Sequence, residues 1–117
     1  LDRPNPEVAA VLARAGVFTA ACLTAWNPGS RLRADSLNRQ AGQALDADLA
    51  ALGLPVHPGE GLDPTGAWPP EPARLVLGIE RGRAVALGRR YGQRALLWID
   101  PDGSARLVDC RLPVTPP

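Results

Sequence analysis

The segment from residue 17 to residue 25, VFTAACLTA, is the feature that most constrains the fold. Side chains of a strand alternate between its two faces, and in this segment both alternate sets are largely apolar. Such a strand has to be covered on both sides, because neither face suits water. The segment therefore predicts a strand in the centre of a sheet.

A helix is expected ahead of this strand. Asn5 can cap it, Pro6 suits the first helical position, Glu7 favours the positive end of the helix dipole, and Gly16 ends it. Its expected buried stripe consists of Val8, Val11, Leu12 and Ala15.

A second helix is expected from a cap at Asp35 or Ser36 to about Leu52, with Gly53 after it. Gly42 stands in its interior at a cost of about 1 kcal/mol relative to alanine. Close packing against the sheet explains such a glycine. The expected buried set of this helix is Leu37, Ala41, Ala44, Leu45, Leu49 and Leu52.

The rest of the chain adds a loop, a third helix and three more strands. Residues 54–73 hold many prolines and glycines, which predicts a structured loop with at most a short edge strand near Val56. The other expected elements are a strand over 74–79, a helix over 83–91 with Ala84, Leu87, Gly88 and Tyr91 inward, and a hairpin of strands 94–99 and 105–110.

The order of these elements predicts an α+β fold. We expect one domain over residues 1–112, with a mainly antiparallel or mixed sheet of four to five strands and about three helices packed on it, and a proline-rich tail over 113–117. A chain of 117 residues is long enough for one core and too short for two domains.

The charge of the chain argues against a general nucleic-acid or membrane surface. Thirteen basic and twelve acidic residues leave a net charge of +1, and no segment has the length of an apolar membrane span. The start of the chain does not resemble a signal peptide, and the absence of Met suggests a trimmed N-terminus. We expect a cytoplasmic protein with no membrane contact.

The sequence offers little for metal or cofactor binding. His57 is the one histidine, and Cys22 and Cys110 lie in expected strands without metal-ligand spacing. The two cysteines are interpreted as reduced core thiols, with a disulfide as the alternative if their strands are neighbours. We therefore expect no metal and no cofactor.

The turn after the central strand, in the segment LTAWNPGSR, is rich in side chains that can hold a ligand. Asn27 can close a turn before Pro28, and Trp26 offers an apolar face with one indole donor. Further donors follow just before a helix N-terminus, a place that favours anions. These donors are Ser30, Arg31 and Arg33.

Polar residues also stand at the ends of other expected strands. Asn27 follows the first strand, whereas Glu71 and Gln93 precede two later ones. If the first strand runs antiparallel to those two, these ends meet at one rim of the sheet. The candidate site for a small polar ligand or partner segment is then Trp26, Asn27, Ser30, Asn38, Arg39, Trp68, Glu71 and Gln93. The alternative is that these polar groups only satisfy the backbone of a proline-rich loop.

Four motifs, TAWNPGSR, SLNRQ, WPPE and YGQRALLW, resemble an uncharacterised bacterial family, the domain of unknown function numbered 3293. The resemblance runs from about Val17 to Val108. It places the family pattern on nearly the same residues as the rim, namely Trp26, Asn27, Pro28, Ser30, Asn38, Trp68, Glu71, Gly92 and Gln93. Family members often have a serine where this chain has Ala73. The resemblance implies no particular reaction.

Two other functions are compatible with the sequence. Glu71 could serve as a general acid or base of an enzyme at the same rim, with Asn27 and Gln93 orienting a substrate. Alternatively, a run of arginines could contact RNA or a ribonucleoprotein, although such a run is usually a solvated helix face. These arginines are Arg81, Arg83, Arg89, Arg90 and Arg94.

Overall fold

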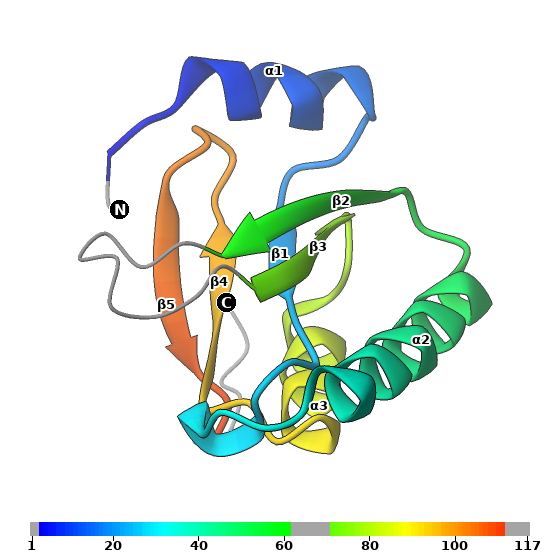
Figure 1. Ribbon diagram of the computed structural model, residues 1–117. Helices are drawn as coiled ribbons and strands as arrows, with labels where there is room; N and C mark the ends of the chain where they lie inside the picture. The colour runs from blue at the N-terminus through cyan, green and yellow to red at the C-terminus, as the bar shows by residue number, and fades with distance from the viewer. Residues whose placement is uncertain (1–2, 62–70, 112–117) are drawn as a thin grey trace.

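The computed structural model describes residues 3–61 and 71–111. This part of the chain contains three α-helices, one short 3₁₀ helix and five strands (Figure 1). The helices are α1 (Pro6–Arg14), η1 (Pro28–Ser30), α2 (Asp35–Leu52) and α3 (Arg81–Arg90), and the strands are β1 (Ala20–Leu23), β2 (Val56–Gly61), β3 (Glu71–Leu77), β4 (Ala95–Ile99) and β5 (Ala105–Asp109). The expected α+β class is confirmed.

All five strands form one antiparallel sheet in the order β2-β3-β1-β4-β5. The predicted central position of the first strand is confirmed, since β1 pairs with β3 on one side and with β4 on the other. In the register, Ala20 lies between Leu77 and Ile99, and Leu23 lies opposite Arg74.

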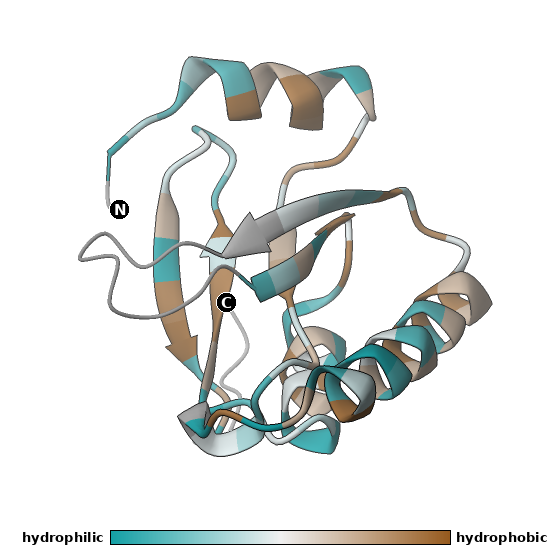
Figure 2. Cartoon of the chain, viewed as in Figure 1, coloured by the Kyte–Doolittle hydropathy of each residue, from teal (hydrophilic) through white to brown (hydrophobic). Residues whose placement is uncertain are grey.

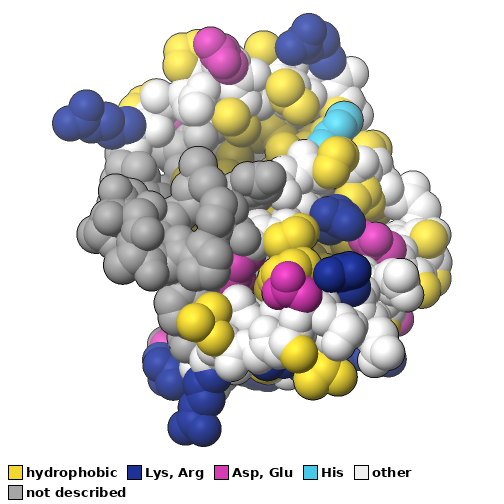
Figure 3. Space-filling model, viewed as in Figure 1, with side chains coloured by type: hydrophobic (Ala, Val, Ile, Leu, Met, Phe, Trp, Pro, Cys, Tyr) yellow, Lys and Arg dark blue, Asp and Glu magenta, His cyan; other side chains and the backbone are white. Residues whose placement is uncertain are grey.

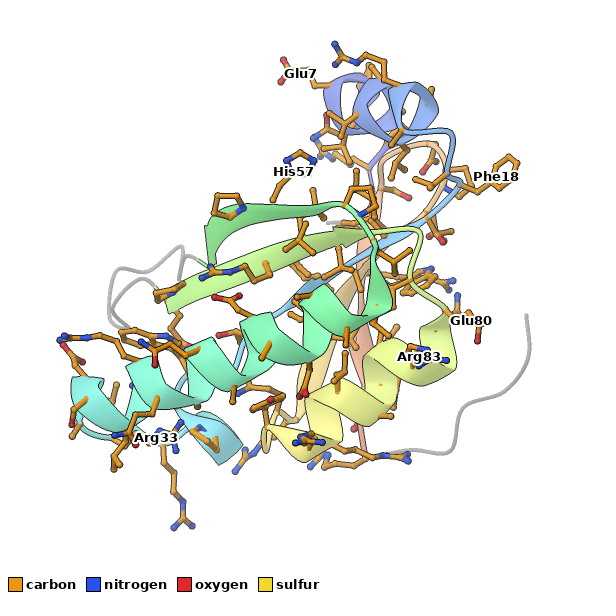
Figure 4. The ribbon with its side chains drawn as sticks, turned by 90° about the vertical axis from the view of Figure 1, so that its right-hand side faces the viewer. Glu7, Phe18, Arg33, His57, Glu80 and Arg83 are labelled. Atoms are coloured by element: carbon orange, nitrogen blue, oxygen red, sulfur yellow. The ribbon has the colours of Figure 1, made fainter. Side chains whose placement is uncertain are left out.

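The helices cover the two faces of the sheet unequally. Figure 4 shows α1 on one face and α2 with α3 on the other. Under α2 and α3, the core contains Ala21, Leu45 and Trp98, together with residues of β3 and α3. On the opposite face, Leu12 of α1 packs with a second group, Ala20, Leu77 and Ile99. The apolar side of α1 is turned toward the sheet (Figure 2).

The first helix begins as expected, because the Asn5 side chain accepts hydrogen bonds from the N–H groups of Glu7 and Val8. Its stripe is shorter than predicted. Leu12 is its one buried residue, whereas Ala15 is exposed, since the helix has already ended at Arg14. The inclusion of Ala15 in the buried stripe was wrong.

The second helix has the expected length and ends at Gly53, but its beginning differs from the prediction. Ala34 occupies the cap position, and no side chain caps the helix. Leu37 is 50% exposed and Ala44 is exposed, whereas Asn38 is buried. The cap at Asp35 or Ser36 and the inward position of Leu37 and Ala44 were wrong.

The proline-rich segment forms more structure than expected. Instead of a short strand near Val56, six residues of β2 pair with β3 along the edge of the sheet. An edge strand tolerates Pro58, because one side of its backbone has no partner strand. The segment from 62 to 70 and the tail from 113 to 117 lie outside the described residues.

The third helix and the hairpin follow the sequence closely. Ala84 and Gly88 of α3 are buried, and so is Val85, which the sequence did not single out. β4 and β5 pair as the predicted hairpin. Cys22 and Cys110 are free thiols, which confirms the interpretation without a disulfide. β4 separates the strand of Cys22 from the strand that precedes Cys110.

Candidate functional site

The antiparallel pairing of β1 with β3 and β4 brings the predicted rim together. Asn27 follows β1, and its amide Nδ2 donates to Glu71 Oε2 at the start of β3, at 3.4 Å. Gln93 precedes β4, and its Nε2 donates to the backbone carbonyl of Trp26 at 2.9 Å. Three polar residues that are far apart in the chain therefore meet around one turn, as strand direction predicted.

Asn27 is the centre of this rim and has an unusual backbone. It is 3% exposed, and its φ of 46° lies in the left-handed region. Non-glycine residues adopt this region uncommonly, and asparagine is among those that tolerate it best. The conformation lets the chain turn from β1 into η1 while the Asn27 side chain points inward.

The buried partner of Asn27 is Asn38, in the first turn of α2. Asn38 Nδ2 donates to Asn27 Oδ1 at 2.9 Å, and Asn38 Oδ1 accepts the backbone N–H of Asn27, also at 2.9 Å. Asn38 is 1% exposed. The prediction that Asn38 reaches the rim is correct in geometry, and its burial explains why Leu37 turns to solvent.

The arginine of the rim is Arg33 rather than Arg39. Arg33 Nε donates to Asn38 Oδ1 at 2.6 Å, and its Nη2 donates to the carbonyl of Ala25 at 3.1 Å. Its backbone N–H also donates to Asn27 Oδ1. Arg39 is exposed on α2. The sequence identified Arg33 as a donor near the turn but gave no signal that it folds back onto Asn38.

The other side of the turn is fixed by the chain ahead of β4. Gly29 N–H donates to the carbonyl of Gly92 at 2.6 Å. Gly92 has a φ of 69°, and a Cβ at this position would lie 2.7 Å from Cβ of Pro28. Glycine is therefore needed at residue 92 for two reasons, its backbone conformation and the contact with Pro28.

A small notch lies between α2 and the end of β1, beside the Asn27 turn. Its volume is about 20 Å³, which suits one group of the size of a water molecule. Gly42 and the Trp26 indole face each other across it. The lining residues are Leu23, Ala25, Trp26, Gly42, Leu45, Asp46, Pro72 and Arg74.

Close packing does not explain Gly42. A Cβ added there would have one neighbour within 4 Å, Trp26 Nε1 at 3.8 Å, which is ordinary van der Waals contact. The prediction that Gly42 allows close approach to the sheet was wrong. An alanine fits at this position, so the glycine leaves a space open next to Trp26.

The family model described as "Protein of unknown function (DUF3293)" matches residues 23–96, which is more than half of the chain. The chain belongs to the DUF3293 family. This confirms the resemblance inferred from the motifs. The match begins in β1 and ends in β4, so it includes the Asn27 turn, α2 and Gln93 but excludes α1. No curated protein and no solved structure matches the chain.

Two residues of the candidate set cannot be placed as side chains. Ser30 ends η1, and its side chain is not described. Trp68 lies outside the described residues. Trp26, the other tryptophan of the candidate set, is half-buried and forms an apolar wall of the rim in this DUF3293 domain.

The arginines around α3 do not form one solvated face. Arg81 lies over the ring of Trp98, with Cζ 4.9 Å from the ring centroid. Arg89 donates from Nε to the carbonyl of Cys110, and Arg90 pairs with Asp48 at 3.3 Å. Arg83 and Arg94 are exposed. Three of the five arginines therefore have contacts within the domain, and RNA binding by this set remains a prediction.

Other ionisable groups lie away from the rim. His57 is exposed on β2, on the side of the sheet that α1 covers. Burial raises the pKa of the Cys22 thiol, which makes it a weak nucleophile at neutral pH. Over residues 3–61 and 71–111, no group of three or more His, Cys, Asp or Glu side chains could hold a metal ion.

The helices give no sign of a membrane span. Within the described ranges, none of them combines the length and the apolar character that crossing a bilayer requires.

Proposed function

We propose that this DUF3293 domain binds a small polar ligand, or the end of a partner segment, at the rim formed by the Asn27 turn, Glu71 and Gln93. The observation that carries the proposal is Gly42. A glycine inside a long helix costs about 1 kcal/mol relative to alanine. Since alanine fits at residue 42, packing does not require glycine there, and the glycine lowers the stability of the helix. Such a loss of stability is common where function needs the space.

The indole of Trp26 gives the notch a donor. Trp26 Nε1 lies 3.8 Å from the position of a Cβ on Gly42, and the described part of the chain provides no hydrogen-bond partner for it. A ligand group entering the notch would meet this N–H together with the apolar side of the ring. A small acceptor, such as a hydroxyl or carbonyl oxygen, satisfies the N–H, and the carbon that carries this oxygen contacts the ring.

The charges around the notch favour a neutral or zwitterionic ligand over a phosphate. Asp46 lines the notch and is paired with Arg74, with Nε to Oδ1 at 2.8 Å. Glu71 lies beside Asn27, on the same rim as Arg33. The carboxylates of Asp46 in the notch and of Glu71 on the rim disfavour polyanions, whereas the presence of both signs of charge suits a molecule with an amino and a carboxylate group.

We further propose that the domain acts in the bacterial cytoplasm. The two free thiols are typical of a reducing compartment, and the family resemblance is to bacterial proteins.

Thermal shifts against amino acids, sugars, nucleotides and short RNAs test the proposal. The decisive pair of variants is Gly42→Ala, which fills the notch, and Gly82→Ala, a glycine of α3 with open space around it. Both should raise the melting temperature by a few degrees, because each removes a helical glycine. A ligand at 100 times its dissociation constant adds about 2.7 kcal/mol to the stability of the protein that binds it.

We expect the ligand shift in the wild type and in Gly82→Ala, and its loss in Gly42→Ala and Glu71→Ala. A shift that survives in Gly42→Ala would place the ligand elsewhere. If no compound shifts any variant, the rim residues serve only to hold the turn. Glu71→Gln separates binding from catalysis, because an enzyme using Glu71 would keep binding and lose turnover.

A further inference from the structure

A second cleft lies on the opposite face of the sheet, between α1 and the edge strand β2. Its volume is about 350 Å³, within the range of small-molecule pockets. Leu77, which is 1% exposed, belongs to its lining. The lining residues are Val11, Arg14, Ala15, Pro55, His57 and Leu77.

The way α1 is attached explains the opening. Its N-terminal end is held by the turn between β4 and β5, where Asn5 N–H donates to the carbonyl of Asp102 at 2.9 Å. Leu12, in the last turn of α1, is the one buried residue of the helix and packs on the sheet. Val11 and Arg14 of the same turn line the cleft together with Ala15, whose side chain is small and exposed.

The ionisable side chains described in the cleft are both basic. Arg14 and His57 border the cleft from α1 and from β2, and among the described residues no acidic side chain lines it. Arg14 Nε donates to the carbonyl of Ala10, and its two Nη groups have no partner among the described residues. Glu7, the acidic residue of α1, points outward from the helix in Figure 4, away from His57.

Apolar surface and positive charge thus occur together in this cleft. Figure 3 shows the histidine next to hydrophobic side chains below α1. An apolar wall with a basic rim is complementary to a molecule that has an apolar body and one anionic head.

We propose that the cleft between α1 and β2 is a binding site for a small amphipathic carboxylate. The apolar chain of the ligand lies against Val11, Ala15 and Leu77, and its carboxylate lies between Arg14 and His57. This site is separate from the Asn27 rim, since α1 is outside the segment matched by the family model and covers the other face of the sheet. Its test is independent of the proposed function.

Octanoate is the probe, with octylammonium and 1-octanol as matched ligands of opposite and zero charge. Backbone amide resonances are followed during titration. We expect octanoate to shift resonances of residues 11–15, 55–57 and 77, and to bind more tightly than either matched ligand. Two variants then test the location. Ala15→Leu adds volume at an exposed position of the cleft wall, and Arg14→Gln removes one positive charge.

Octanoate binding should be lost in Ala15→Leu and weakened about three- to fivefold in Arg14→Gln, because an exposed ion pair contributes modestly. Arg83→Gln, on the other side of the sheet, removes the same charge and should leave binding unchanged. The proposal is overturned if octanoate shifts no resonance of the cleft, if octylammonium binds equally well, or if a folded Ala15→Leu variant still binds octanoate.

Discussion

Asn27 and Asn38 hold each other by two hydrogen bonds in the interior of the domain. Asn38 Nδ2 donates to Asn27 Oδ1, and Asn38 Oδ1 accepts the Asn27 backbone N–H, both at 2.9 Å. This pair links the turn after the central strand to the first turn of α2. It satisfies two buried amide side chains and one backbone group, so removing either residue leaves polar atoms without partners.

Replacing Asn38 with alanine should therefore destabilise the domain by about 2–4 kcal/mol, because Asn27 N–H and Arg33 Nε each lose a buried acceptor. Urea unfolding measures this change. Gln40→Ala, at an exposed position of the same helix, is the control and should change stability by at most about 0.5 kcal/mol. A loss in Asn38→Ala no larger than that of the control would show that the pair is not needed for stability.

Gly92→Ala should destabilise the domain more than Gly53→Ala. Both glycines have a φ near 70°, at 69° and 68°, so both substitutions carry the same backbone strain of about 1 kcal/mol. Gly53 has open space, whereas a Cβ on Gly92 would lie 2.7 Å from Cβ of Pro28. We expect an additional loss of about 1–3 kcal/mol for Gly92→Ala in thermal unfolding. Equal losses would mean that the contact with Pro28 relaxes freely.

The stability contributed by Asp109 should disappear in acid. Arg111 donates to this carboxylate from its backbone and its guanidinium, and these hydrogen bonds lower the pKa of Asp109 to about 2. Because the folded pKa is below the unfolded value, the contribution is fully present above about pH 4 and is lost as the pH falls through about 2.

Comparing wild type with Asp109→Asn checks this pH dependence. The wild type should be the more stable protein in urea at about pH 5, and the difference should be smaller at about pH 2, where about half of the Asp109 carboxyl groups are protonated and neutral like asparagine. A difference of the same size at both pH values would exclude titration of Asp109 as its cause.

The location of the rim was predictable from the sequence because it depends on strand direction. Asn27, Glu71 and Gln93 lie at strand ends, and antiparallel pairing alone brings those ends together. The hydrophobic periodicity of β1 was sufficient to place it in the centre of the sheet, because a strand that is apolar on both faces has no other position.

The position of the buried stripe on α2 was less predictable. Helical spacing favours Leu37 as the inward residue, yet Asn38 is buried and Leu37 is 50% exposed. The hydrogen bonds of Asn38 with Asn27 decide the outcome, and a periodicity of apolar residues contains no information about them.

Arg33 and β2 show two further limits of sequence patterns. Arg33 approaches Asn38 through the path of a loop, and no spacing rule describes that path. The prolines and glycines of residues 54–73 predict a loop with at most a short edge strand near Val56, but pairing with β3 makes an edge strand of Val56–Gly61. In both cases, tertiary contacts override the local preference of the sequence.

The indole N–H resonance of Trp26 gives the most direct test of the ligand site. The panel of amino acids, sugars, nucleotides and short RNAs is titrated into ¹⁵N-labelled protein, and the Trp26 resonance is assigned by its absence in Trp26→Phe. We predict that a compound which binds the rim moves the Trp26 signal and fails to move it in Gly42→Ala, while the signal of Trp98, buried below Arg81, stays in place. A panel that leaves the Trp26 signal unchanged, or a ligand that moves it equally in Gly42→Ala, would contradict binding at this rim.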